Sequence, residues 1–106
     1  MELSEVFTLL PQAFLPERAA GINATVCMQV TGAGGGSWYI TIKDQQCAVS
    51  QTAVPNPRLT ISMTAQDANL ILAGKLDAMK AYMQGKLRMT GDMNLAMRFT
   101  SLFKSP

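Results

Sequence analysis

Residues 77–103 read DAMKAYMQGKLRMTGDMNLAMRFTSLF, and this stretch decides the fold. Its turn and cap residues divide it into a helix from Asp77 to Gly85, a short strand over 86–90, and a helix capped by Asp92. Five of the eight methionines of the chain lie within it. Methionine is unbranched and polarizable, so it either fills irregular gaps in a core or lines a cavity for a flexible apolar ligand. The stretch by itself leaves both interpretations open.

The last helix is predicted to carry more apolar surface than one neighbour can cover. Projected at about 100° per residue, it has two apolar sectors and a narrow polar one. The first sector holds Met93, Ala96, Met97 and Thr100, and the second holds Leu95, Phe99, Leu102 and Phe103. A surface helix needs only one such stripe. One sector can pack on a sheet, and the other requires a second apolar partner: another helix, a second subunit or a ligand.

The rest of the chain alternates between helix and strand signals. Residues 1–15 are predicted to be helical, with a further turn over 16–18, and a helix capped by Thr64 is predicted to end at Gly74. Alternating apolar and polar residues predict strands over 22–31, 37–43, 46–51 and 58–63, with Asp44–Gln45 as a hairpin turn. This order predicts an α+β fold in one domain over 1–106. Its five-stranded, mostly antiparallel sheet is covered by helices on one face.

Charge is unevenly distributed along the chain. The whole sequence has nine Lys and Arg against seven Asp and Glu, but from residue 75 onward basic residues outnumber acidic ones six to two. This basic third could face the anionic headgroups of a membrane surface, or it could simply be solvated. The basic residues are sparse and lack interleaved aromatics, so nucleic-acid binding is not predicted.

Little in the sequence suggests catalysis or a cofactor. The chain has no histidine, and its two cysteines cannot by themselves build a structural zinc site. The carboxylates are scattered at caps and turns, where each has a structural explanation. We therefore expect no enzyme activity, no metal and no cofactor. Cys27 and Cys47 are interpreted as free, mostly buried thiols, with a disulfide as the lesser alternative.

The N-terminus is acidic where a secretory signal would be basic, and no apolar run is long enough to span a bilayer. A soluble cytoplasmic protein is the corresponding expectation.

The second half of the chain carries a succession of motifs: Leu59–Thr64 (LTISMT), the Gly74–Lys75 helix end, Met83–Leu87 (MQGKL) and Asp92–Met97 (DMNLAM) after Gly91. Together they resemble the sterol carrier protein type 2 lipid-binding domain. Pro11, Phe14, Pro16, the run Ala19-Ala20-Gly21, and Trp38 with Asp44 also fit, so the resemblance spans nearly the whole chain. It implies a five-stranded sheet with helices on one face and an apolar tunnel between them. In that family the tunnel holds sterols, fatty acids, fatty acyl-CoAs or isoprenoids.

The resemblance implies candidate wall positions for this tunnel. They are Leu70, Ile71, Met79, Met83, Leu87, Met89, Met93, Leu95, Met97, Phe99, Leu102 and Phe103, with Gln84 as a polar group. Gln84 could equally satisfy backbone groups at a helix end.

The leading hypothesis is non-catalytic binding of one apolar lipid, for transfer or for presentation to an enzyme. The alternative is an accessory or scaffold subunit that holds isoprenoid quinone intermediates for biosynthetic enzymes. A dimerising structural domain is a third reading, so a partner enzyme and a homodimer both stay open.

Overall fold

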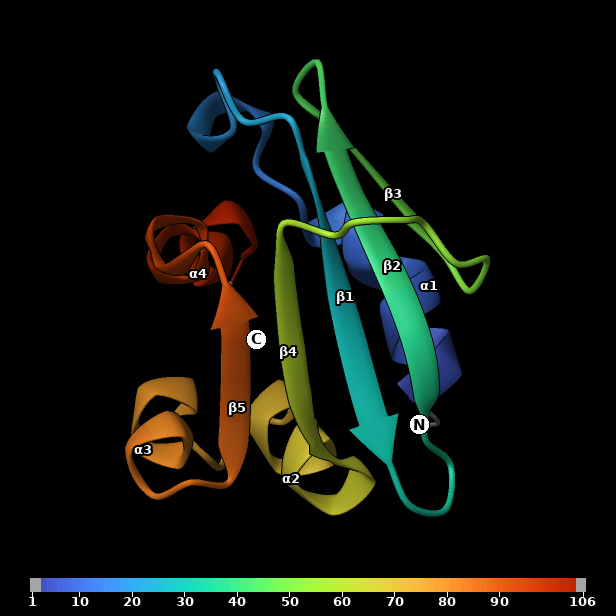
Figure 1. Cartoon of the computed structure of the whole chain (residues 1–106), viewed down its shortest axis with the longest axis vertical. Helices are drawn as coiled ribbons and strands as arrows, with labels where there is room; N and C mark the ends of the chain where they lie inside the picture. The colour runs from blue at the N-terminus through green and yellow to red at the C-terminus, as the bar shows by residue number, and fades with distance from the viewer. Residues whose placement is uncertain (1–2, 105–106) are drawn as a thin grey trace.

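The computed structural model describes residues 3–104 and contains one five-stranded mixed sheet, with strands in the order β3-β2-β1-β4-β5 (Figure 1). The strands are β1 (Ala24–Thr31), β2 (Gly36–Lys43), β3 (Gln46–Ser50), β4 (Leu59–Thr64) and β5 (Leu87–Gly91). The pairs β1–β2, β2–β3 and β4–β5 are antiparallel, and β1–β4 is parallel. The prediction of a mostly antiparallel sheet is therefore confirmed.

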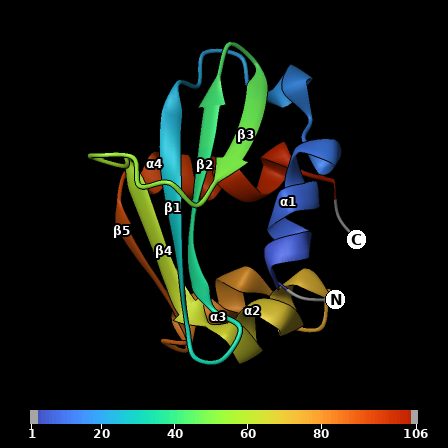
Figure 2. The ribbon, with the colours of Figure 1, turned by 90° about the vertical axis from the view of Figure 1, so that its right-hand side faces the viewer.

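The helices lie together on one face of this sheet, as its edge-on view shows (Figure 2). They are α1 (Leu3–Ala13), α2 (Ala65–Leu72), α3 (Ala78–Met83) and α4 (Met93–Phe99), with the short 3-10 helices η1 (Pro16–Arg18) and η2 (Thr100–Leu102). The predicted helix over 1–15 corresponds to α1, and Met1 and Glu2 lie outside the described residues. The predicted helix-covered face is confirmed.

The alternation of side chains along each strand determines which of them are buried in the core. In β1, Val26, Met28 and Val30 are buried against the helices, and in β4 Leu59, Ile61 and Met63 do the same. Because successive side chains of a strand point to opposite faces, the residues between them lie on the uncovered face. Phe7 of α1 stacks on Trp38 of β2 with ring centroids 4.6 Å apart, which fixes α1 against the sheet.

Backbone conformation supports the predicted turns and caps. Asp44 and Gln45 both have positive φ, as a tight two-residue hairpin turn requires. The Thr64 hydroxyl accepts a hydrogen bond from the Asp67 amide at 3.1 Å and begins α2. The Asp77 carboxylate accepts from the amides of Met79 and Lys80 at 2.8 and 3.1 Å and begins α3.

The last α-helix is shorter than predicted, so the projection at about 100° per residue does not hold beyond its end. The α-helix α4 ends at Phe99 and continues as the 3-10 turn η2, in which residues advance by a third of a turn rather than by about 100°. Leu102 is fully buried, and the rings of Phe99 and Phe103 meet edge to face at 5.3 Å.

The second apolar partner of the chain end is its own N-terminal segment. Phe103 pairs with Phe14 in an isolated β-bridge, and their rings lie 5.8 Å apart. The Leu15 amide donates to the Leu102 carbonyl at 2.7 Å, and the Lys104 amide donates to the Ala13 carbonyl at 2.8 Å. The predicted second sector is therefore covered by protein, and the sector of Met93 and Met97 is the one left exposed.

Gly91 holds the end of β5 against the start of β4, and we expect Gly91→Ala to destabilise the fold strongly. Its φ is +121°, and an added Cβ would overlap the carbonyl oxygen of Arg58. We expect a loss of about 3 kcal/mol, because backbone strain and a backbone clash act together. Gly85→Ala is the matched control: it also has positive φ, but open space surrounds it, so the loss should be about 1 kcal/mol. Urea unfolding of both variants measures the difference, and equal losses would contradict this account.

Candidate functional site

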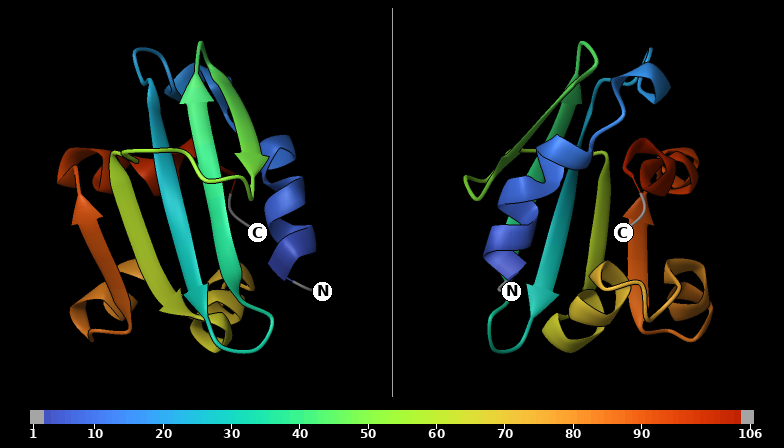
Figure 3. Two further views of the ribbon diagram at one scale, coloured as in Figure 1. Left: turned by 45° about the vertical axis from the view of Figure 1, so that its right-hand side comes forward. Right: turned by 180° about the vertical axis from the view of Figure 1, so that it is seen from behind.

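An apolar cleft of about 240 Å³ lies between α3 and α4. Its floor is the inner face of the sheet at β4 and β5, and its sides are the two helices. Figure 3 shows β5 passing between α3 and α4 when the molecule is seen from behind. The lining residues are Ile61, Ala78, Met79, Leu87, Met89, Ala96, Met97 and Phe99.

Four exposed methionines lie on the two helices that flank this cleft, and we call Met79, Met83, Met93 and Met97 the methionine rim. Their exposed fractions are 57%, 81%, 41% and 74%. Met79 and Met97 line the cleft from opposite helices. Met83 and Met93 lie four residues away on α3 and α4, which places each on the same helical face as its partner in the cleft. Among the described residues, these methionines are four of the seven large apolar side chains that are exposed, the others being Leu9, Leu70 and Tyr82.

Two exposed lysines lie near the cleft. Lys80 is on α3 and Lys86 lies just before β5, whereas Arg88 alternates with the lining residues Leu87 and Met89 and so lies on the opposite face of the sheet. The two acidic residues of this region act as helix caps: the Asp77 carboxylate begins α3, and the Asp92 carboxylate accepts from the Leu95 amide at 3.1 Å. Bonds from helix amides and the positive end of the helix dipole hold these carboxylates at the helix starts. An anionic surface approaching α3 would therefore meet lysines beside the methionine rim.

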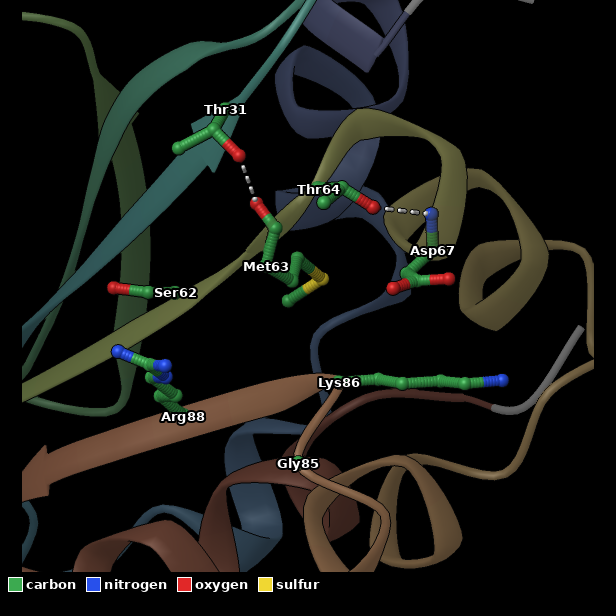
Figure 4. A pocket seen from close by; sticks show the side chains of 8 residues that line it. All are labelled: Thr31, Ser62, Met63, Thr64, Asp67, Gly85, Lys86 and Arg88. Carbon is green, nitrogen blue, oxygen red and sulfur yellow. Dashed lines mark hydrogen bonds between the residues drawn. The ribbon is translucent and has the colours of Figure 1, made fainter.

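A second hollow, of about 370 Å³, lies where β4 leads into α2 (Figure 4). Hydroxyl and charged side chains dominate its lining: Thr31, Ser62, Thr64, Asp67, Lys86 and Arg88, together with Met63 and Gly85. Asp67, Lys86 and Arg88 all line it, so both signs of charge are present. This hollow is less apolar than the cleft between α3 and α4.

The structure brings together part of the predicted wall. Five of the predicted residues line the cleft: Met79, Leu87, Met89, Met97 and Phe99. Met83 and Met93 lie on the rim. Leu95, Leu102 and Phe103 pack in the core behind α4, while Leu70 and Ile71 lie on α2. Gln84 is exposed at the C-cap of α3, where its backbone N–H donates to the Lys80 carbonyl at 2.9 Å.

Three lining residues were absent from the sequence prediction: Ile61, Ala78 and Ala96. Ile61 could have been found, because the alternation in β4 points it to the same face as Leu59 and Met63. The two alanines gave no signal, since a small residue is apolar without being large enough to mark a wall. Their small size is what leaves space between α3 and α4.

The cysteines lie away from the cleft and on opposite faces of the sheet. Cys27 is buried on the uncovered face opposite Tyr39, and Cys47 packs against the core from β3. Both are free thiols, as predicted. Within residues 3–104 no group of three or more potential ligands gathers in a way that could hold a metal ion.

Burial raises the pKa of the Cys47 thiol to about 11, from an ordinary value of 9.0. The folded state thus favours the neutral thiol, and this contribution to stability is complete below about pH 9 and is lost as the pH rises toward 11. We expect Cys47 to react with iodoacetamide at pH 9 roughly fiftyfold more slowly in the folded protein than in urea, since only the thiolate attacks and a pKa of about 11 leaves about one hundredth of the thiol ionised, against about half in urea. Peptide mapping after timed quenching measures the rate at each cysteine. Equal rates in the two states would show that the thiol is accessible and ordinary.

Fold and cleft together define an α+β domain with an apolar hollow between its sheet and two of its helices. The chain belongs to the SCP-2 sterol transfer family, whose model matches residues 4–104. Human sterol carrier protein 2 is 29% identical over 90 residues, which cover 85% of this chain and 16% of the human protein. This chain thus spans about a sixth of the length of that relative.

Two solved structures illustrate the similarity in fold. Palmitated SCP2L2 from Aedes aegypti matches with a TM-score of 0.74 at 21% identity, covering 95% of this chain and 93% of that one. The ubiquinone synthesis protein UbiJ-SCP2 matches with a TM-score of 0.72 at 17% identity, covering 93% of this chain and 90% of that one. No helix within residues 3–104 has both the length and the apolar character needed to cross a membrane.

Proposed function

We propose that this protein reversibly binds one apolar lipid chain in the cleft between α3 and α4, for transfer or presentation, without catalysing a reaction on it. The observation that carries the proposal is the apolar cleft opening between exposed methionines. Exposed apolar groups gathered at one place mark an interaction site more often than scattered ones do. Membership of the SCP-2 sterol transfer family supports the same class of ligand.

The energetics favour a flexible chain over a rigid polar molecule. Each buried methylene contributes about 0.8 kcal/mol before the costs of ordering are subtracted. A chain of about a dozen methylenes would therefore bind without a specific polar contact, and selectivity among apolar chains should be loose. The palmitated state of the mosquito protein makes a fatty acyl chain the first ligand to test.

The cleft must widen to hold such a chain. Its volume of about 240 Å³ lies below the range of roughly 300–1,000 Å³ in which ligand pockets usually fall. The methionine side chains can move to enlarge it, because each has three rotatable bonds and few contacts at the rim. Both α3 and α4 present an alanine to the cleft, so movement of either helix away from the other would enlarge the cleft.

Charge complementarity supports transient contact with an anionic membrane surface on this side of the molecule. Lys80 and Lys86 are exposed beside Met79 and Met83 of the rim. Each basic residue near an anionic bilayer contributes about 1 kcal/mol to its attraction. In this arrangement a lipid would leave the bilayer and enter the cleft with little exposure to water.

Titration with the fluorescent fatty acid cis-parinaric acid tests the proposal, followed by its transfer to vesicles. We expect saturable binding with one site, displacement by palmitate, and faster transfer to phosphatidylglycerol vesicles than to phosphatidylcholine vesicles. Absence of saturable binding would reject the proposed function. Equal transfer to both vesicles would reject only the membrane contact.

A scaffold role with isoprenoid quinone intermediates is the second candidate, favoured by the likeness in fold to UbiJ-SCP2. The same titration separates the two roles. Displacement of the probe by a polyprenyl chain but not by palmitate would favour the scaffold.

A further inference from the structure

The eight methionines fall into groups with very different access to solvent. The four residues of the methionine rim are 41–81% exposed. Met28 and Met63 are 9% and 7% exposed and belong to the core, and Met89 is half-buried on the cleft floor. Met1 lies outside the described residues. Because oxidation of methionine depends on access, a peroxide would reach the rim sulfurs well before those of the core.

The position of the exposed sulfurs gives their oxidation a specific consequence. Met79 and Met97 line the cleft from its two sides, and Met83 and Met93 extend the same helical faces. A lipid chain entering between α3 and α4 contacts Met79 and Met97, with Met83 and Met93 about one helical turn away on the same helices. In their reduced form they offer flexible apolar contacts, and nothing in the cleft lining is charged.

The chemical step is a simple oxygen transfer. The thioether sulfur attacks one oxygen of hydrogen peroxide, the oxygen–oxygen bond breaks, and the sulfur gains that oxygen as a sulfoxide. The other oxygen leaves with both hydrogens as water, so the sulfur is oxidised and the peroxide is reduced. The product is a polar, chiral side chain in place of an apolar one, and methionine sulfoxide reductases reverse it.

We propose that the methionine rim is an oxidation site through which hydrogen peroxide reversibly controls lipid binding in the cleft. This inference rests on the proposed function and adds its regulation. A sulfoxide at the rim must be dehydrated when an apolar chain covers it, and burying an unpaired polar group is unfavourable. The fold survives the change, because the rim residues are exposed and Met28 and Met63 stay protected in the core.

The test begins with limited peroxide treatment and peptide mapping of each methionine. We expect sulfoxide at Met79, Met83, Met93 and Met97 before Met28 and Met63, with unchanged circular dichroism. The dissociation constant of cis-parinaric acid should rise about tenfold or more, equivalent to about 1.4 kcal/mol. Treatment with methionine sulfoxide reductases A and B should restore binding.

A variant with all four rim residues changed to leucine is the matched control. Leucine keeps the rim apolar and cannot be oxidised, so peroxide treatment should leave the affinity of this variant at its own untreated value, whatever that value is. Oxidised rim residues with unchanged binding would overturn the inference, and so would loss of binding by the peroxide-treated leucine variant. If the untreated wild-type protein binds no probe at all, the proposed function itself is overturned. The two failures are thus distinguished.

Discussion

Ala78→Trp is expected to abolish binding of a fatty-acid probe while leaving the fold intact. Ala78 is the first residue of α3, half-buried, and it lines the cleft. An indole ring at this position would occupy much of a space of only about 240 Å³. We expect the dissociation constant of cis-parinaric acid to rise more than tenfold, because the ligand would have to displace a side chain that already fills the site.

The control is Ala48→Trp. Ala48 is exposed on β3, outside the cleft lining, and a strand accepts an aromatic residue well. Both proteins should unfold within about 1 kcal/mol of wild type, since the indole at residue 78 enters the empty space of the cleft and the one at residue 48 lies on the surface, so neither overpacks the core. Fluorescence titration and urea unfolding on the same samples give the two quantities. Full binding by Ala78→Trp would place the lipid site elsewhere, with the second hollow, beside Lys86, as the region to examine next.

Local signals in the sequence predicted most of the fold. The strands follow alternation, and Thr64, Asp77 and Asp92 cap α2, α3 and α4 in the structure as expected. These features depend on residues that are close together in the chain, so local sequence patterns predict them. The parallel pairing of β1 with β4 was not foreseen, because it depends on how the chain crosses between strands that are far apart in sequence.

The candidate site was predicted less completely, for a different reason. Large apolar residues in a helix indicate that the helix packs against a partner, but they do not identify that partner. Met97 and Leu102 looked alike as wall candidates, yet one is 74% exposed beside the cleft and the other is fully buried. The change from α-helix to 3-10 turn after Phe99, and the pairing of Phe103 with Phe14, decide between them. Neither depends on a local pattern.

Leu102→Ala is expected to lower the free energy of unfolding by about 2–5 kcal/mol, as is usual for a fully buried leucine. The side chain has no exposed surface, and the Leu102 carbonyl accepts the Leu15 amide at 2.7 Å, so the residue fastens the chain end to the segment after α1. A domain of this size has only about 5–15 kcal/mol of stability in total. The variant should therefore approach unfolding at moderate temperature.

Met97→Ala provides the contrast that separates wall from core. Met97 lines the cleft and is largely exposed, so its truncation should change stability by less than about 0.5 kcal/mol while weakening lipid binding. Leu102→Ala should do the reverse below its unfolding transition, with the fold weakened and the affinity of the remaining folded protein nearly unchanged. Thermal unfolding and probe titration at low temperature measure both properties in each variant. A Leu102→Ala protein that is stable but no longer binds the probe would make Leu102 part of the lipid site, and the cleft would then have to extend behind α4 toward Phe14.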